Sequence, residues 1–424
     1  MEYEARLTAA DLAAIDDRLA TADAALARAY PGDPGTRQPV HTVYLPADRF
    51  HAELVPEWGA TALATLAAHA STPAELGSIA GLEPSLAAAV YDRVALKLAA
   101  EPIEDLRIDF EDGYGHRPVA QEDAAAVHAA VALAGARAER ALPPFVGLRV
   151  KSLEPATRRR GLRTLDLFLA AMLADAPLPA GFVITFPKVT AVEQVEALVD
   201  VCARLEAAYR LPAGRLRFEL QIETPQSVLG ASGTVTVAQF VHASAGRCVG
   251  LHYGTYDYSA AIGVAGGFQS LEHPAADQAK ALMQIAAAGT GVRLSDGSTN
   301  VLPVGSKAAV LEALRLHARL VRRSLERAFY QGWDLHPAQL PTRFAATYGF
   351  YREALPAAAA RLRAYLDKVA GGVLDEPATA RALADVLVRG LDCGAVDEAE
   401  VLVLAGLDAA ELRRVRHSPI TPAE

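Results

Sequence analysis

The densest group of reactive side chains in this sequence is an acidic run, Asp109-Phe110-Glu111-Asp112, which Gly113-Tyr114-Gly115 follows. Three carboxylates within four residues repel one another unless a cation or hydrogen-bond donors offset their charge. One interpretation is therefore a functional cluster that includes Glu111 and Asp112. The other is a solvated turn at the start of a helix, where acidic residues are favoured. The run by itself does not decide between the two.

A second group of charged residues is basic and lies in an apolar segment, Phe145–Lys151. Strand alternation over this segment puts Arg149 and Lys151 on one face. An arginine that points into a protein interior is costly unless an anion meets it. The planar guanidinium fork suits a carboxylate or an enolate, so Arg149 is a candidate for substrate binding. A structural ion pair with the nearby acidic run is the alternative.

Two further carboxylates, Glu223 and Asp257, follow apolar segments that also have strand character. Glu223 ends Arg217–Glu223, and Asp257 comes shortly after Cys248–Tyr253 and the flexible Gly254. If the two segments are neighbouring parallel strands, both carboxylates lie at the same edge of the sheet. Two carboxylates with water and substrate oxygens are typical of a Mg²⁺ site. We therefore predict that Glu223 and Asp257 bind Mg²⁺, with Mn²⁺ as an alternative metal.

The elements that would position these side chains are eight short apolar runs, each bounded by turn or capping residues. Helical patterns of 10–20 residues separate most of them, such as the one over Thr190–Tyr209. The runs are His41–Leu45, Leu106–Phe110, Phe145–Lys151, Gly181–Val189, Arg217–Glu223, Cys248–Tyr253, Val292–Ser295 and Trp333–His336.

Strands that alternate with helices predict a parallel sheet, and closure of eight units gives a (β/α)₈ TIM barrel, an α/β fold. The rival is an open doubly wound sheet, which usually has a glycine-rich phosphate turn after its first strand. Here Pro46-Ala47-Asp48 follows the first strand, so the barrel is favoured. In such a barrel the chemistry lies at the C-terminal ends of the strands. The acidic run, Arg149, Glu223 and Asp257 all fall there.

We expect three regions along the chain. Residues 1–38 form an N-terminal helical extension, with a helix over about Ala9–Tyr30. Residues 39–345 form the barrel, with an insertion of two or three helices over about 51–103, one of them Glu83–Ala100. Residues 346–424 form a C-terminal helical region, broken near Gly371-Gly372 and Gly390–Gly394. This tail needs a surface to pack on, which favours a second subunit and hence a homo-oligomer.

Composition narrows the class of protein. The 424 residues carry a net charge of −9, which argues against a nucleic-acid partner because that needs a basic face. No apolar stretch is long enough for a membrane span, and the acidic N-terminus lacks the pattern of a signal peptide. The three distant cysteines, Cys202, Cys248 and Cys393, fit a reducing compartment and are expected to be buried. We therefore expect a cytoplasmic protein with no membrane partner.

Two histidines need separate interpretations. His252 lies inward by alternation with Gly254, and a core histidine with satisfied hydrogen bonds is the favoured reading. His336 ends the eighth predicted strand and is a candidate for the floor of the site. His273-Pro274 is typical of a helix start.

Taken in order, these strand ends resemble the HpcH/HpaI aldolase and citrate lyase β-subunit family of phosphoenolpyruvate/pyruvate-type barrels. The resemblance covers about residues 40–345. Six short motifs of the family have counterparts in this sequence. Near the second, third and fourth strands, Asp109–Asp112 resembles Asp-Leu-Glu-Asp, Arg149–Lys151 resembles Arg-Val-Asn, and Pro187–Val189 matches Pro-Lys-Val. Near the fifth, sixth and eighth strands, Ile222–Thr224 matches Ile-Glu-Thr, Gly254–Asp257 resembles Gly-x-x-Asp, and Leu335–Gln339 resembles Ile-His-Pro-x-Gln.

The resemblance implies a carbon–carbon bond lyase or aldolase that acts through an enolate on a small anionic oxo-acid or a CoA ester. It implies that Glu223 and Asp257 hold Mg²⁺, which neutralises charge on the enolate oxygen. Arg149 would bind a substrate oxygen, and the N–H groups of Gly254, Thr255 and Tyr256 would cradle a substrate carboxylate. Glu111 or Asp112 would hold a water molecule or transfer a proton, and alternation leaves the choice open.

The sequence also departs from the family pattern. Lys151 stands where the family commonly has Asn, and its charge favours a more anionic substrate. The first strand lacks the Arg-Ser start and Pro-Gly end of the citrate lyase branch. Two alternatives to the lyase stay open: a phosphoryl or acyl transferase built on the same enolate site, and an inactive barrel that acts as a binding protein.

Overall fold

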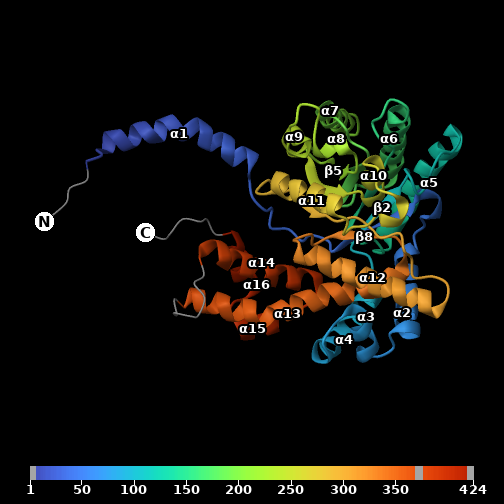
Figure 1. Cartoon of the computed structure of the whole chain (residues 1–424). Helices are drawn as coiled ribbons and strands as arrows, with labels where there is room; N and C mark the ends of the chain where they lie inside the picture. The colour runs from blue at the N-terminus through green and yellow to red at the C-terminus, as the bar shows by residue number, and fades with distance from the viewer. Residues whose placement is uncertain (1–5, 368–375, 418–424) are drawn as a thin grey trace.

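Eight parallel strands surround a common axis in the computed structural model, which describes residues 6–367 and 376–417. The strand order is β7-β6-β5-β4-β3-β2-β1-β8, and a bridge between Ser295 and Gln331 brings β7 beside β8. The chain is therefore a (β/α)₈ TIM barrel, and the predicted fold class is confirmed (Figure 1). The strands are β1 (His41–Pro46), β2 (Asp105–Asp109), β3 (Phe145–Arg149), β4 (Phe182–Phe186), β5 (Arg217–Ile222), β6 (Cys248–Tyr253), β7 (Arg293–Ser295) and β8 (Gly332–Asp334).

The strands match the eight predicted runs, and the differences at their ends are of one to three residues. The difference that bears on the site is in β3, which ends at Arg149 rather than at Lys151. Alternation therefore does not extend to Lys151, which lies beyond the ladder.

The two faces of the sheet differ in chemistry. Apolar side chains such as Ile108, Leu148 and Ile184 are fully buried on the outer face, where the helices pack. The inward positions carry polar side chains instead. Arg107 is 1% exposed and donates to Asp105, to Glu219 (2.9 Å) and to Thr185 (3.0 Å). A buried charge is tolerated when it is paired and hydrogen-bonded in this way.

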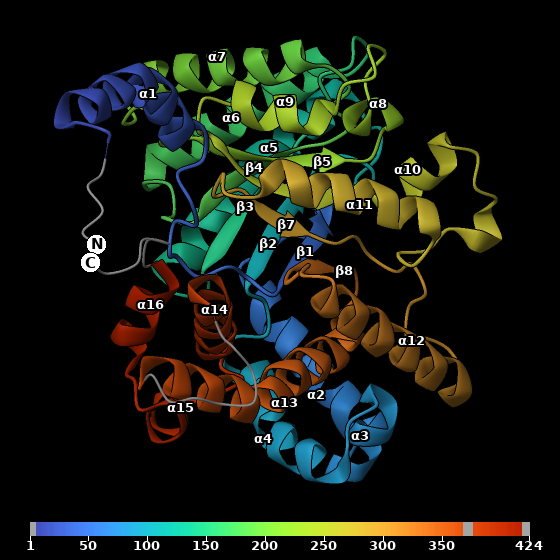
Figure 2. The same ribbon diagram turned by 60° about the vertical axis from the view of Figure 1, so that its left-hand side comes forward.

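Helices follow the strands and cover the barrel (Figure 2). The apolar positions of α7 that are buried, Val195, Leu198 and Cys202, recur at intervals of three and four, as an amphipathic helix requires. These helices are α5 (Val119–Ala138), α6 (Arg158–Asp175), α7 (Val192–Ala208), α8 (Pro225–Val228), α9 (Thr236–Ala243), α10 (Thr255–Ala261), α11 (Pro274–Ala287) and α12 (Lys307–Glu326).

The predicted insertion contains three helices, α2 (Leu54–His69), α3 (Pro73–Ala80) and α4 (Pro84–Ala100). The C-terminal helices are α13 (Leu340–Leu366), α14 (Pro377–Cys393), α15 (Glu398–Ala405) and α16 (Ala409–His417). Figures 1 and 2 show both groups gathered on one side of the barrel.

These two helical groups pack on each other. Helix α13 contacts α4, α12 and α14. The tail thus finds its packing surface on the insertion of its own chain, where the sequence had suggested another subunit. The predicted break near Gly390–Gly394 is present, since α14 ends before Gly394, which has a φ of +83°. The predicted break at Gly371-Gly372 lies outside the described residues.

The N-terminal helix α1 (Ala9–Ala29) extends away from the barrel (Figure 1). Thr8 and Asp11 form a capping box at its start, which satisfies N–H groups that the first turn leaves without partners. None of its residues is buried, and Leu12, Ile15, Leu19 and Leu26 are about half exposed or more.

All three cysteines are buried and free, as their apolar surroundings predict. Across residues 6–367 and 376–417, no helix is both long enough and apolar enough to cross a bilayer.

One buried carboxylate joins the end of β8 to the helices around it. Asp334 is inaccessible and accepts hydrogen bonds from His41 (2.7 Å), His317 (2.9 Å) and Arg343 (3.0 Å). Burial alone would raise the pKa of Asp334, but Arg343 and the two histidines hold it well below its usual value. Because His41 belongs to β1, His317 to α12 and Arg343 to α13, Asp334 ties the closing strand pair to the C-terminal helices.

Replacing Asp334 with Asn should therefore lower the free energy of unfolding by roughly 3–5 kcal/mol, because it leaves Arg343 buried without its carboxylate. Urea denaturation followed by circular dichroism measures the change. Asp200→Asn, at an exposed position of α7, is the matched control and should change the stability by less than about 0.5 kcal/mol. Equal stability of the two variants would show that Asp334 does not hold these elements together.

Candidate functional site

The carboxyl ends of β2 to β6 bring ionisable side chains to one end of the barrel. The parallel register places Asp109 of β2 beside Arg149 of β3. Glu223 directly follows β5, and Asp257 lies in α10, which follows β6. Because β5 and β6 pair, these two carboxylates come from adjacent strand ends, the arrangement on which the predicted metal site depends.

Arg149 points into the barrel mouth and is buried. Its Nε and Nη2 donate to the two carboxylate oxygens of Asp109, at 2.7 and 2.6 Å. Its Nη1 lies 3.3 Å from Glu111 and 3.4 Å from Gln221, and the guanidinium lies over the ring of Tyr44. The bidentate pair fixes the plane of the guanidinium, so Nη1 is presented toward Glu111 in a set direction.

Lys188, which follows β4, lies at the centre of the acidic cluster. Its Nζ donates to Glu111, lies 2.9 and 3.0 Å from the oxygens of Asp112 and is 3.4 Å from Asp257. Its backbone N–H donates to Glu223 at 2.8 Å. Its φ is +52°, a backbone conformation that a non-glycine residue adopts at a cost and that clusters at functional sites. Burial lowers the pKa of Lys188, but the carboxylates of Glu111 and Glu223 raise it above its ordinary value. The ammonium therefore stays charged.

Glu223 is 3% exposed and carries the most perturbed carboxyl of the cluster. Burial, together with Glu111 and Asp257, raises the pKa of Glu223 to about 8. Gly254 lies directly against it, since a Cβ built there would come within 2.4 Å of Glu223 Oε2. Only glycine lets the β6 backbone approach the carboxylate this closely.

The two candidate acids, Glu111 and Asp112, occupy different surroundings. Glu111 is 8% exposed and contacts both Lys188 and Arg149. Burial raises its pKa despite these two cations. Asp112 has a side chain that is 58% exposed, and its hydrogen bonds with Lys188 lower its pKa against the effect of partial burial. Glu111 is thus the acid that faces Arg149, which alternation alone did not establish.

The residues present fit a hard divalent cation. Across the described parts of the chain, no three His, Cys, Asp or Glu side chains are arranged as a ready metal cluster. However, Glu111, Asp112, Glu223 and Asp257 all interact with one ammonium, that of Lys188. Arg149 also approaches Glu111 but is already paired with Asp109, so these four carboxylates exceed the positive charge available to them and the group is anionic. Carboxylate oxygens are the ligands that Mg²⁺ prefers. Glu223 and Asp257 would hold the metal.

The other predicted contacts are placed as follows. Lys151 Nζ donates to Glu122 (2.9 Å) and to the backbone oxygens of Phe110 (2.7 Å) and Gly115 (3.3 Å). These acceptors use all three of its donors, so here Lys151 holds the loop after β2 against α5. Its predicted contact with a substrate stays a prediction.

The glycine-bearing segment after β6 provides fewer donors than expected. The N–H of Gly254 donates to Ile222 O at 3.1 Å, within the ladder between β5 and β6. Thr255 and Tyr256 begin α10, where first-turn N–H groups have no partner inside the helix. The hydroxyl of Tyr256 accepts from Asn300 N at 2.6 Å. Within the described residues, the N–H groups of Thr255 and Tyr256 therefore have no partner inside α10, and the carboxylate cradle stays a prediction.

His252, His273 and His336 all take part in hydrogen bonds within the protein. His252 is 1% exposed, and its ring nitrogens contact Trp333 (3.0 Å) and Glu219 (3.2 Å). Its interpretation as a core histidine is confirmed. His336 Nδ1 accepts from Ala338 N at 3.1 Å and caps the short helix η3 (Pro337–Gln339), and His273 caps α11 in the same way.

Sequence reasoning did not assign roles to three residues of this site. Asp109 orients Arg149, Lys188 links the carboxylates, and Gln221 lies beside Arg149. Within the described residues, the buried Nε2 of Gln221 has no hydrogen-bond partner. The sequence held two signals for these roles. One is Pro187, which precedes Lys188, and the other is the alternation that puts Gln221 on the same inward face as Glu223.

Several solved structures are similar to this chain. A citrate lyase from Burkholderia xenovorans LB400 has a TM-score of 0.56 at 21% identity, covering 74% of this chain and 91% of its own. A malate synthase from Haloferax volcanii gives a TM-score of 0.47 at 15% identity, covering 90% and 97%. An HpcH/HpaI aldolase/citrate lyase family protein from Burkholderia cenocepacia J2315 gives 0.39 at 15% identity, covering 74% and 94%.

At these identities the likeness to the citrate lyase shows a shared fold. No curated protein matches the sequence. Residues 19–420, nearly the whole chain, match the model of a family described as "Domain of unknown function (DUF6986)", and the chain belongs to that family.

Proposed function

We propose that this protein is a Mg²⁺-dependent carbon–carbon bond lyase or aldolase that acts through a substrate enolate. The substrate class is a small anionic oxo-acid or a CoA ester. We place the chain as a divergent relative of the HpcH/HpaI aldolase and citrate lyase group, whose fold it shares. The observation that carries the proposal is the convergence of Glu111, Glu223 and Asp257 on Lys188 at the barrel mouth.

The charge balance supports a divalent cation at this point. Burial and the neighbouring carboxylates of Glu111 and Asp257 together raise the pKa of Glu223. Such a cluster is costly unless a further positive charge compensates it. When bound by Glu223 and Asp257, Mg²⁺ would act as a Lewis acid toward negative charge that develops on a carbonyl oxygen.

The chain's own residues supply the remaining parts of the chemistry. Arg149, held by Asp109, presents Nη1 to a substrate oxygen, which would compete with Glu111 for that donor. Gln221 Nε2, without a partner in the described residues, is a second donor beside it. Glu111, with its raised pKa, can hold or move a proton next to Arg149. Lys188 stays protonated and acts as a fixed positive charge.

Metal binding is tested by thermal unfolding. Mg²⁺ should raise the melting temperature of the protein, because a ligand that binds only the folded state stabilises it. Glu223→Ala and Asp257→Ala should abolish the shift, whereas Asp200→Ala on α7 should retain it. A full Mg²⁺ shift in both site variants would rule out these two residues as the metal ligands.

Enolisation is tested separately by solvent deuterium exchange into pyruvate or oxaloacetate, followed by NMR. Exchange should require Mg²⁺ and should fall by at least about 100-fold in Arg149→Lys, because the lysine lacks the bidentate fork. Glu111→Gln should lose far more exchange than Asp112→Asn, since only Glu111 faces Arg149. Failure of a broad set of oxo-acids and CoA esters to exchange would favour a binding protein over an enzyme.

The perturbed Glu223 carboxyl also predicts a pH dependence of the metal-free protein. Its pKa rises from 4.5 in the unfolded chain to about 8 in the fold, so the folded state binds more protons between these values. Stability should therefore decline as pH rises from 5 to 8, by at most about 1.4 kcal/mol per unit from this group. Urea unfolding at several pH values measures the slope. Glu223→Gln should flatten it, while Glu196→Gln, exposed on α7, should not.

A further inference from the structure

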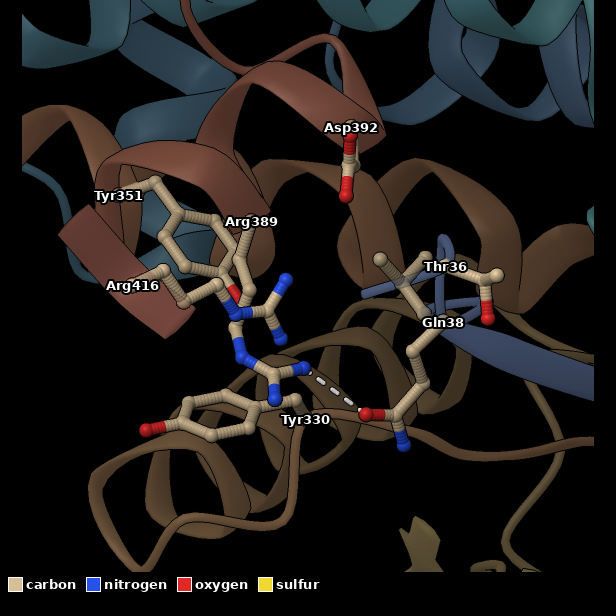
Figure 3. Close-up of a pocket in the computed structure, with 8 residues that line it drawn as sticks. Thr36, Gln38, Tyr330, Tyr351, Arg389, Asp392 and Arg416 are labelled. Carbon is tan, nitrogen blue, oxygen red and sulfur yellow. Dashed lines mark hydrogen bonds between the residues drawn. The ribbon is translucent and has the colours of Figure 1, made fainter. Parts of the chain in front are cut away.

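A second concave site lies at the opposite end of the barrel from the carboxylate cluster. It is a cavity of about 280 Å³. Its walls come from the segment before β1, the start of β7 and helix α14, with Gln38, Arg293 and Arg389 among the lining residues. Figure 3 shows the adjoining part of this surface, where Arg389 and Arg416 approach each other near the ring of Tyr330.

Two of the arginines around this cavity are fully paired. Arg389 donates to Asp385 (2.8 Å) and to Gln38 (2.8 Å), and its guanidinium lies 4.3 Å from the ring centre of Tyr330. Arg416 pairs with Asp33 (2.7 Å) and also with Asp385 (2.8 Å). Asp385 is thus shared between these two guanidinium groups, and Asp33 also lies 4.0 Å from Arg389.

The third arginine, Arg293, has no such partner. It is the first residue of β7 and half-buried, and its Nη2 donates to the backbone oxygen and hydroxyl of Thr36, both at 2.6 Å. In the part of the chain that the structure describes, no carboxylate lies within 4.0 Å of it. The cavity is thus lined by the guanidinium groups of Arg293 and Arg389 and by the carboxylate of Asp33, while Arg416 lies on the adjoining surface.

A guanidinium that lines a cavity without a carboxylate partner favours an anion. Burial lowers the pKa of Arg293, and the nearby Arg389 and Arg416 add to this, while the charges of Asp33 and Glu219 oppose it. This is the energetic cost that a bound oxyanion would relieve. The fork geometry of a guanidinium fits carboxylate and phosphate groups. The cavity volume and its partly apolar wall, which includes Val292 and Leu294, suit a small organic acid or phosphate ester.

We propose that this cavity is a binding site for a small metabolite with a carboxylate or phosphate group, held by Arg293. The site is separate from the proposed catalytic end, and its ligand would contact the N-terminal segment, the barrel and α14 together. Binding would therefore stabilise the attachment of the C-terminal helices to the barrel.

The test measures binding of two probes, inorganic phosphate and malonate, to the metal-free full-length protein. Isothermal calorimetry gives the dissociation constant and thermal unfolding gives the stabilisation, each compared with sodium chloride at the same ionic strength. At least one probe should bind and raise the melting temperature above the chloride value. Preference for phosphate would identify a phosphate ester as the ligand class, and preference for malonate would identify a carboxylic acid.

Two variants locate the binding. Arg293→Gln should weaken binding of the probe by about tenfold or more, because a hydrogen bond to a charged group contributes about 1.5–3 kcal/mol. Arg293→Lys should retain part of the affinity. Ala288→Phe fills the cavity from an exposed position and should also block binding, with Ala288→Ser as its control. Arg315→Gln, at an exposed arginine of α12, should bind like the unchanged protein.

Two outcomes would overturn the proposal. One is that neither probe binds better than chloride. The other is that both probes bind equally well to Arg293→Gln and Ala288→Phe, which would place them elsewhere. Both results are independent of the metal site, because Glu223 and Asp257 are intact in every variant.

Discussion

The barrel depends on a column of buried charge along its axis. Arg107 occupies the middle of this column, where Asp105 and Glu219 neutralise it. Arg149 and Asp109 form the next pair toward the mouth. Each pair joins side chains from different strands or from alternate positions of one strand. A shift of register by one residue would therefore separate the two charges of a pair between strands inside the barrel. Breaking a buried pair is strongly destabilising, and the column therefore favours one register over its neighbours.

This column also prepares the mouth of the barrel for chemistry. The pair with Asp109 uses the Nε and Nη2 donors of Arg149 and leaves Nη1 toward Glu111. At the same level Glu223 is buried against Gly254 and receives the backbone N–H of Lys188. The strained backbone at Lys188 is thus compensated by several contacts at once. The charged groups of this site are thus oriented by contacts within the protein, which is the condition for electrostatic preorganisation.

Much of the fold could be predicted from the sequence, because period-two apolar runs and helical periodicity are local signals. The eight strands, the helix over Thr190–Tyr209 and the barrel itself follow from them. The residues Arg149, Glu223 and Asp257 could be placed at one end because parallel strands align their carboxyl ends.

The contacts among these residues could not be predicted. Whether Glu111 or Asp112 faces Arg149 depends on how the chain turns after β2, and Lys151 leaves the expected face because β3 ends two residues earlier. The role of Lys188 depends on a positive φ that sequence does not reveal. The packing of the tail on α4 joins segments far apart in the chain, which local patterns do not encode. The homo-oligomer, the compartment and the substrate stay predictions.

The contact between α4 and α13 has a consequence for biosynthesis. Helix α4 leaves the ribosome early, whereas α13, which covers part of it, is made only after the last strand. Until then the apolar face of α4 that includes Val90, Val94 and Leu98 lacks one of its permanent neighbours. Exposed apolar surface of this kind promotes aggregation of nascent chains. Helices α2 and α3, which are made before α4 and contact it, are its available partners until α13 is synthesised.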